Sequence, residues 1–160
     1  MKIIISIIFL LSLTIFNFSY SSEYNAIVSK VTDGDSIHII DKGKTIKVRL
    51  LYIDAPELKQ SYGVESKKFL ENMILNKTVT ISCEKKDIYG RELCEIFLYE
   101  SDAPTYINAK MIKSGNAWVY KSSRSNVYLV NLEKDAIRYK RGLWHSDDAI
   151  EPWIYRKLKK

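Results

Sequence analysis

The sequence has few zinc-binding residues and no sign of a second domain. Cys83 and Cys94 are its only cysteines, and His38 and His145 are its only histidines. Two cysteines without a nearby histidine cannot build a zinc site, and neither histidine has a partner at a diagnostic spacing. No internal repeat and no low-complexity linker interrupts the 160 residues. These absences exclude a zinc site and a repeat architecture, and they predict a single domain.

Long apolar segments are also missing, except at the N-terminus. Residues 3–16 form an apolar run that follows one positive charge and precedes the small-x-small site Ser19-Tyr20-Ser21, a pattern typical of a secretory signal peptide. The run is short for a membrane span, which takes roughly 20 residues; an uncleaved N-terminal anchor is the alternative. We expect a signal peptide over 1–21 and an exported protein, periplasmic or secreted, of residues 22–160. After cleavage we expect no stable membrane association.

Basic residues outnumber acidic ones along the chain. There are 25 Lys and Arg against 19 Asp and Glu, a formal net charge of +6. A positive field attracts polyanions and speeds their encounter, but many basic proteins bind nothing acidic. Part of the excess lies in the tail over residues 156–160, which we expect to be a solvated, frayed end rather than a specific site.

Carboxylates and arginines concentrate in three short segments. These are 33–36 (DGDS), 49–57 (RLLYIDAPE) and 87–91 (DIYGR). Acidic groups can hold a hard divalent cation, and guanidinium groups can clamp a phosphate and oppose the charge that develops in its transition state. One further carboxylate can take a proton from water. The set predicts an enzyme that cleaves phosphodiester bonds of nucleic acid with the help of a metal ion.

Two strand-like runs, 77–83 and 93–99, flank the 87–91 segment and predict a hairpin. Folding this hairpin about its centre places Cys83 opposite Cys94. Facing residues in an antiparallel pair lie close enough for a disulfide, and export makes that bond chemically plausible. We therefore expect a disulfide, with two unpaired core thiols as the alternative.

The remaining pattern predicts a compact α+β domain that is mostly β. Further strands are expected over 23–31, 36–40 and 45–53, and helices over 64–75, 107–113 and 127–140. Five strands interleaved with three peripheral helices indicate a small, partly open barrel of the OB type.

The three segments and a fourth at 115–120 (GNAWVY) resemble, in order and spacing, the motifs of the staphylococcal nuclease (thermonuclease) family. The resemblance covers residues from about Tyr24 to Trp144. It implies a five-stranded OB-fold barrel with three helices and a calcium-dependent nuclease that acts on DNA and RNA. Such enzymes cut the bond between phosphorus and the 5′ oxygen and leave 3′-phosphate ends. We expect a monomer.

The resemblance also assigns a metal site. Asp35 and Asp54 match the carboxylate ligands of one calcium ion, and the backbone carbonyl of Ala55 would supply a further oxygen. Helix-cap or turn roles are the alternative for both aspartates, and magnesium is not excluded by ligand type. Asp33 precedes a glycine and is expected to shape the turn rather than to bind metal.

Catalytic roles fall on three further residues. By the resemblance, Glu57 is the general base, and Arg49 and Arg91 bind the phosphate. Surface charges without a role are the alternative for the arginines. Arg49 argues against this alternative, because it lies in the apolar run Val48–Ile53, where a charge needs an anionic partner.

Three aromatic residues are candidates for substrate contact. Trp118 and Tyr120 alternate on an expected strand, so their rings should point to the same side, and stacking on a base is worth roughly 1–3 kcal/mol. Packing in the core is the alternative for both. Tyr89, within the third segment, is a further candidate.

A non-catalytic OB module that binds single strands is the competing function. Such modules use basic grooves and aromatic platforms but have no use for three clustered acids. Asp35, Asp54 and Glu57 together would repel phosphate unless a cation intervened. The acids therefore favour the enzyme.

Overall fold

The structure is a computed structural model that describes residues 23–159. The expected signal peptide and its cleavage site lie outside these residues. Within the described part of the chain, eight strands occur. Their bounds are β1 (Glu23–Val31), β2 (Ser36–Asp41), β3 (Lys44–Leu50), β4 (Ile53–Asp54), β5 (Thr78–Lys86), β6 (Glu92–Leu98), β7 (Thr105–Tyr106) and β8 (Trp118–Val119).

Five of these strands close into a barrel, which confirms the predicted fold class. The strands run in the order β3-β2-β1-β5-β6, and a parallel pairing of β3 with β6 completes the circle. Alternate residues of each strand point inward, as the period of a strand requires. The fully buried side chains include Val28, Ile37, Ile39, Val48, Leu50, Ile81 and Ile96.

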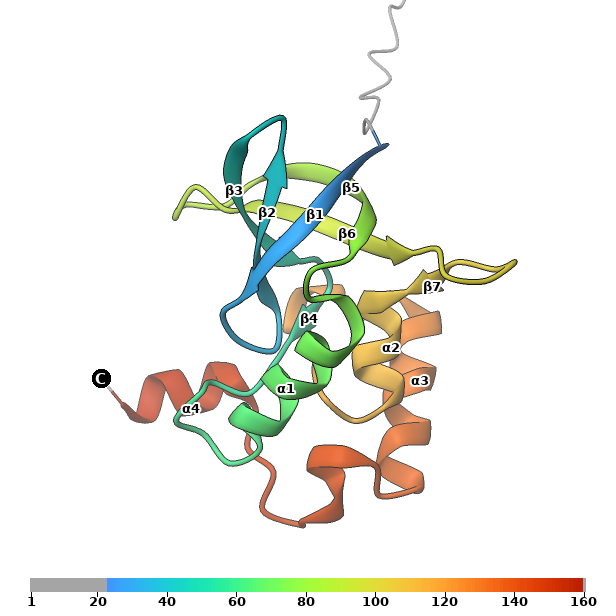
Figure 1. Cartoon of the computed structure of the whole chain (residues 1–160). Helices are drawn as coiled ribbons and strands as arrows, with labels where there is room; N and C mark the ends of the chain where they lie inside the picture. The colour runs from blue at the N-terminus through green and yellow to red at the C-terminus, as the bar shows by residue number, and fades with distance from the viewer. Residues whose placement is uncertain (1–22, 160) are drawn as a thin grey trace, which may run out of the picture.

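Among residues 23–159, four α-helices lie outside the barrel, one more than predicted. They are α1 (Gly63–Ile74), α2 (Ile107–Lys113), α3 (Val127–Arg138) and α4 (Pro152–Leu158), and two short 3-10 turns, Lys121–Ser123 and Gly142–His145, flank α3. Figure 1 shows the barrel above, with α1, α2 and α3 packed below it. In the same view α4 lies to the left, away from α2 and α3.

The additional helix corrects the expectation of a frayed C-terminal end. Helix α4 begins at Pro152, and proline is well suited to the first turn of a helix. Pro152 is buried, so the chain is anchored where α4 starts. The run of basic residues at the end of the chain predicted exposure to solvent. It gave no sign that the start of α4 is buried.

The expected strand over 45–53 is also corrected, because it is broken by a turn. Strand β3 ends at Leu50, and Tyr52 has a positive φ of 68°. The backbone N–H of Leu51 donates to the carbonyl of Cys94 at 2.8 Å before the chain turns into β4. An uninterrupted apolar run gives no sequence signal for such a turn. The turn places Asp54 in β4 instead of in a continuation of β3.

The predicted hairpin forms with the predicted register. Strands β5 and β6 are antiparallel, and Cys83 lies opposite Cys94. The two sulfurs are joined by a disulfide with an S–S distance of 2.11 Å. The crosslink is therefore close to the turn that carries Arg91.

Membrane-spanning helices were sought within residues 23–159. None of the helices there combines the length and the apolar character needed to cross a bilayer.

Candidate active site

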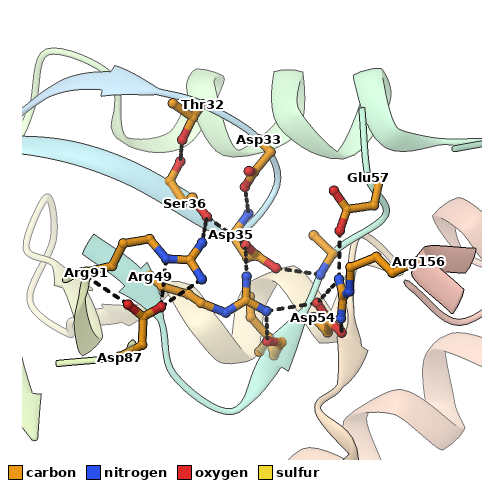
Figure 2. A network of polar contacts seen from close by, with 12 residues as sticks. Thr32, Asp33, Asp35, Ser36, Arg49, Asp54, Glu57, Asp87, Arg91 and Arg156 are labelled. Atoms are coloured by element: carbon orange, nitrogen blue, oxygen red, sulfur yellow. Dashed lines mark hydrogen bonds and ion pairs between the residues drawn. The ribbon is translucent and has the colours of Figure 1, made fainter. Parts of the chain in front are cut away.

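One end of the barrel is hollowed into a cleft of about 670 Å³. The three segments singled out in the sequence all contribute to its lining, although they come from different turns and strands. The polar residues gathered in or beside this cleft are Asp33, Asp35, Arg49, Asp54, Glu57, Asp87, Arg91 and Arg156, and Figure 2 shows them as one connected network.

The turn between β1 and β2 holds Asp35 in place. The carboxylate of Asp33 accepts the backbone N–H of Asp35 at 3.0 Å, which is the turn-shaping role expected for Asp33. Gly34 is required at the next position, because a Cβ there would lie 2.0 Å from Oγ of Ser66. The turn therefore packs tightly against α1 and fixes the position of the acid that follows.

Arg49 connects the two aspartates. It lies in β3 between β2 and β6, paired with Ser36 on one side and Leu93 on the other. One terminal nitrogen is 2.5 Å from Asp35, and the other is 2.8 Å from Asp54. Burial opposes the charge of Arg49, but the two carboxylates outweigh it and raise the pKa of its guanidinium. The anionic partners that a buried arginine requires are thus present.

Both aspartates are withdrawn from solvent. Asp35 is 3% exposed and Asp54 is fully buried. Burial raises the pKa of Asp35, and the charge of Arg49 partly offsets the rise. The carboxylate of Asp35 also accepts the backbone N–H of Ala55 at 2.8 Å. Buried carboxylates of this kind are costly unless cations lie beside them, so the arrangement is suited to positive charge.

Arg91 is positioned by an acid that the sequence analysis did not assign a role. Its guanidinium donates to Asp87 at 2.8 Å and to Oγ of Ser36 at 3.2 Å. Asp87 also accepts the backbone N–H groups of Tyr89 and Arg91, each at 2.9 Å. Partial burial opposes ionisation, but these hydrogen bonds lower the pKa of Asp87. The spacing of Asp87 and Arg91 across a glycine-containing turn could have predicted that the two residues contact each other.

Arg156 is the second residue that sequence reasoning missed. It reaches the cleft from α4, with one terminal nitrogen 2.7 Å from Asp54 and the other 2.7 Å from Glu57. Hydrogen bonds to Asp54 and Glu57 raise the pKa of its guanidinium. No sequence pattern indicated these contacts, because the partners of Arg156 lie about 100 residues earlier in the chain.

The three candidate aromatic residues occupy different environments. Tyr89 is 75% exposed at the hairpin tip, with the Arg91 guanidinium carbon 5.6 Å from its ring centre. Tyr120 lines the cleft. Trp118 is 4% exposed and packs edge-to-face against Trp144 at 5.0 Å.

The expectation that Trp118 and Tyr120 share one side is therefore wrong. Strand β8 ends at Val119, so Tyr120 no longer alternates with Trp118 as a strand residue would. Trp118 packs against Trp144, and of these two residues Tyr120 is the one that lines the cleft.

The donor set of the cleft fits a hard divalent cation. Its acidic side chains offer only oxygen atoms, the ligands that calcium and magnesium prefer. Elsewhere among the described residues, Cys83, Cys94 and Glu92 also lie close together, but both sulfurs are used in the disulfide. That cluster is therefore not available to a metal ion, whereas the acids at the barrel end offer oxygen atoms.

Comparison with known proteins identifies the family. The family model described as "Staphylococcal nuclease homologue" matches residues 47–146. The chain belongs to the staphylococcal nuclease family. The matched part of this family member includes Arg49, Asp54, Glu57 and Arg91, and it ends before α4 begins.

Relatives of this staphylococcal nuclease homologue extend the match over most of the chain. A protein of Escherichia coli O157:H7 described as "Uncharacterized endonuclease" is 37% identical over 92% of this chain and 96% of its own length. A "Micrococcal nuclease" of Shigella flexneri is 32% identical over 87% of this chain and 84% of its own length. Membership in this family supports nuclease activity and a nucleic-acid substrate.

Proposed function

We propose that the protein is a calcium-dependent nuclease that hydrolyses DNA and RNA at the bond between phosphorus and the 5′ oxygen, leaving 3′-phosphate ends. One observation carries this proposal: Arg49 bridges Asp35 and Asp54 at 2.5 and 2.8 Å, with Glu57 and Arg91 lining the same cleft. The residues that we propose as cation ligands, phosphate donors and general base therefore lie close together, which supports the proposal.

The metal would be held by Asp35, Asp54 and the backbone carbonyl of Ala55. Calcium accepts six to eight oxygen ligands in flexible geometry, so two carboxylates and a carbonyl suit it once water completes the shell. When bound, the ion supplies positive charge that opposes the charge developing on the phosphate.

The arginines and Glu57 account for the remaining chemistry. A guanidinium presents a planar fork that pairs with two phosphate oxygens, and Arg49 and Arg91 line the same cleft. Glu57 is half-exposed there, so water can reach its carboxylate. In that position it can take a proton from a water molecule attacking phosphorus.

A non-catalytic OB module for single strands is the alternative proposal. Tyr120 in the cleft and Tyr89 at its rim would suit base stacking. Asp35 and Glu57 in the cleft, with Asp54 buried beside it, oppose simple phosphate binding, because like charges repel unless a cation lies between them. We therefore favour the nuclease.

The test is digestion of labelled DNA and RNA in calcium, in magnesium and in chelator, with analysis of the product ends. We expect cleavage of both polymers in calcium, with products bearing 3′-phosphate and 5′-hydroxyl groups. Binding without cleavage in every condition would support the OB module instead. Products with 5′-phosphate ends would refute the proposed position of bond cleavage.

We also propose that the protein is exported. The apolar N-terminal run supports this, and the Cys83–Cys94 disulfide suits an oxidising compartment. N-terminal sequencing of the protein from cell fractions should find the chain starting at Ser22 outside the cytoplasm. Recovery of the uncleaved chain from the cytoplasm would contradict export.

A further inference from the structure

The C-terminal helix places a cation against the candidate metal ligands. Helix α4 carries Arg156 into the cleft, where its guanidinium lies between Asp54 and Glu57 (Figure 2). We propose that Arg156 is a built-in counter-cation of the acidic cluster that a divalent metal ion must displace. Metal binding would then release α4 from the site.

Contacts at Asp54 show why the two cations would compete. One carboxylate oxygen of Asp54 accepts from Arg49 at 2.8 Å, and the other accepts from Arg156 at 2.7 Å. Arg156 donates to the first oxygen as well, at 3.2 Å. A calcium ion approaches its oxygen ligands to 2.3–2.6 Å. Both oxygens of Asp54 are already engaged, so an ion that takes Asp54 as a ligand must push the Arg156 guanidinium aside.

The charges of the cluster favour the same exchange. Three carboxylates share two guanidinium groups here, namely Asp35, Asp54 and Glu57 with Arg49 and Arg156. With Arg156 in place the cluster keeps one net negative charge. Once Arg156 leaves, two negative charges remain, which one divalent ion neutralises. Arg156 therefore stabilises the acids until a stronger cation takes its place.

Helix α4 is held in a way that permits release. Besides Arg156, α4 is held at its start by the buried Pro152, and two hydrogen bonds join it or the preceding residue to the 59–60 segment: the Tyr155 hydroxyl donates to the carbonyl of Lys59 at 2.9 Å, and Gln60 donates to the carbonyl of Ile150. Seven residues make a helix too short to be stable by itself in water. Arg156 is 41% exposed, whereas Arg49 is 17% exposed within the barrel. Movement of α4 would leave the barrel side of the site intact.

Coupling of this kind has a measurable consequence. If the metal binds only when Arg156 is displaced, its apparent affinity is lowered by the fraction of molecules in which the site is free. Removing Arg156 should therefore strengthen metal binding. This inference rests on the proposed metal site, and the experiment separates the two claims.

The experiment is calorimetric titration of calcium chloride into the full chain and its variants. Arg156→Gln should bind calcium about tenfold more tightly than the wild type, a change that corresponds to the loss of a charge-assisted hydrogen bond. Lys157→Ala is the matched control: Lys157 is exposed on the same helix, and its removal deletes one charge without touching the acids. The calcium affinity of Lys157→Ala should stay within about twofold of wild type, because salt largely screens a surface charge that does not touch the acids.

Three results would overturn the proposal. Equal affinity of the wild type and Arg156→Gln would refute displacement while leaving the metal site standing. Weaker binding by Arg156→Gln would show that Arg156 holds the acids in place instead. An absence of calcium binding in every protein would refute both displacement and the proposed metal site.

A second measurement does not depend on a substitution. Backbone amide ¹⁵N relaxation of residues 152–158 in the wild-type protein should show increased motion on the picosecond–nanosecond timescale when calcium is added. Amides of β3 should not change in the same way. Unchanged order of α4 at saturating calcium would overturn its release.

Discussion

Arg49 and Arg156 contact the same carboxylate from opposite parts of the molecule. Arg49 comes from a barrel strand with neighbours on both sides, and its partners Asp35 and Asp54 are almost fully buried. Arg156 comes from a seven-residue helix at the end of the chain and is more exposed. The barrel thus holds one cation within a paired strand, and the C-terminal helix supplies the one that we propose can exchange.

This difference bears on which half of the cleft would perform the proposed chemistry. Groups that stabilise a transition state must be held in position beforehand. Arg49 meets this condition through β3, and Arg91 meets it through its hydrogen bonds to Asp87.

Removing an acid on the barrel side should have the largest effect. Asp54→Asn keeps the size of the side chain but removes the charge that both arginines and the proposed cation share. We expect loss of calcium binding by calorimetry and loss of cleavage to background. Asp102→Asn, on an exposed loop, is the control and should behave as wild type. Wild-type activity of Asp54→Asn would remove this residue from the metal site.

Arginine-to-lysine substitutions should distinguish the barrel side of the cleft from the side formed by α4. Arg49→Lys and Arg91→Lys keep the charge but lose the planar fork, so cleavage rates in saturating calcium should fall by about 10²–10³. Arg156→Lys should instead change the calcium concentration required for half-maximal cleavage. Arg138→Lys, exposed on α3, is the control. Rates within a few-fold of wild type for Arg49→Lys would place that arginine outside the chemistry.

A substitution of Glu57 tests the proposed general base of the cleft. Glu57→Gln should lower kcat more than it raises KM, because a general base acts on the reacting water rather than on substrate binding. Steady-state kinetics on a short oligonucleotide measure both constants. If KM rises while kcat holds, Glu57 positions the substrate.

The disulfide should give the smallest effect, on stability rather than chemistry. Cys83 and Cys94 are 11 residues apart, and closing a loop of this size is worth about 3 kcal/mol in the chain-entropy model. Reduction should lower the thermal midpoint by several degrees. A double Cys83→Ser, Cys94→Ser variant is the control, and its midpoint should not respond to reductant. An unchanged midpoint for reduced wild-type protein would contradict the expected stabilisation.

Much of the barrel was predictable because its signals are local. Alternation of apolar and polar residues indicates a strand, and symmetry of the hairpin about its turn placed Cys83 opposite Cys94. Each metal-ligand and arginine candidate lies in a short motif, so the sequence could nominate Asp35, Arg49 and Asp54 before their contacts were known. What the motifs could not supply was the bridge that Arg49 makes between the two acids.

The features that escaped prediction depend on long-range contacts. The turn at Tyr52 interrupts an unbroken apolar run, and the burial of Trp118 depends on Trp144. Arg156 is one of several basic residues in a charged tail, and only the folded chain brings it to Asp54. Periodicity and spacing describe neighbours along the chain and carry no information about such pairings.

The rate at which the wild-type protein cleaves a labelled single-stranded DNA, measured across a calcium titration that starts in chelator, tests the proposed nuclease centre directly. The barrel-end cleft, if it is a cation-dependent nuclease centre, should give no cleavage in chelator and a rate that rises and saturates with calcium. Cleavage at an undiminished rate in excess chelator, or none at saturating calcium, would contradict it.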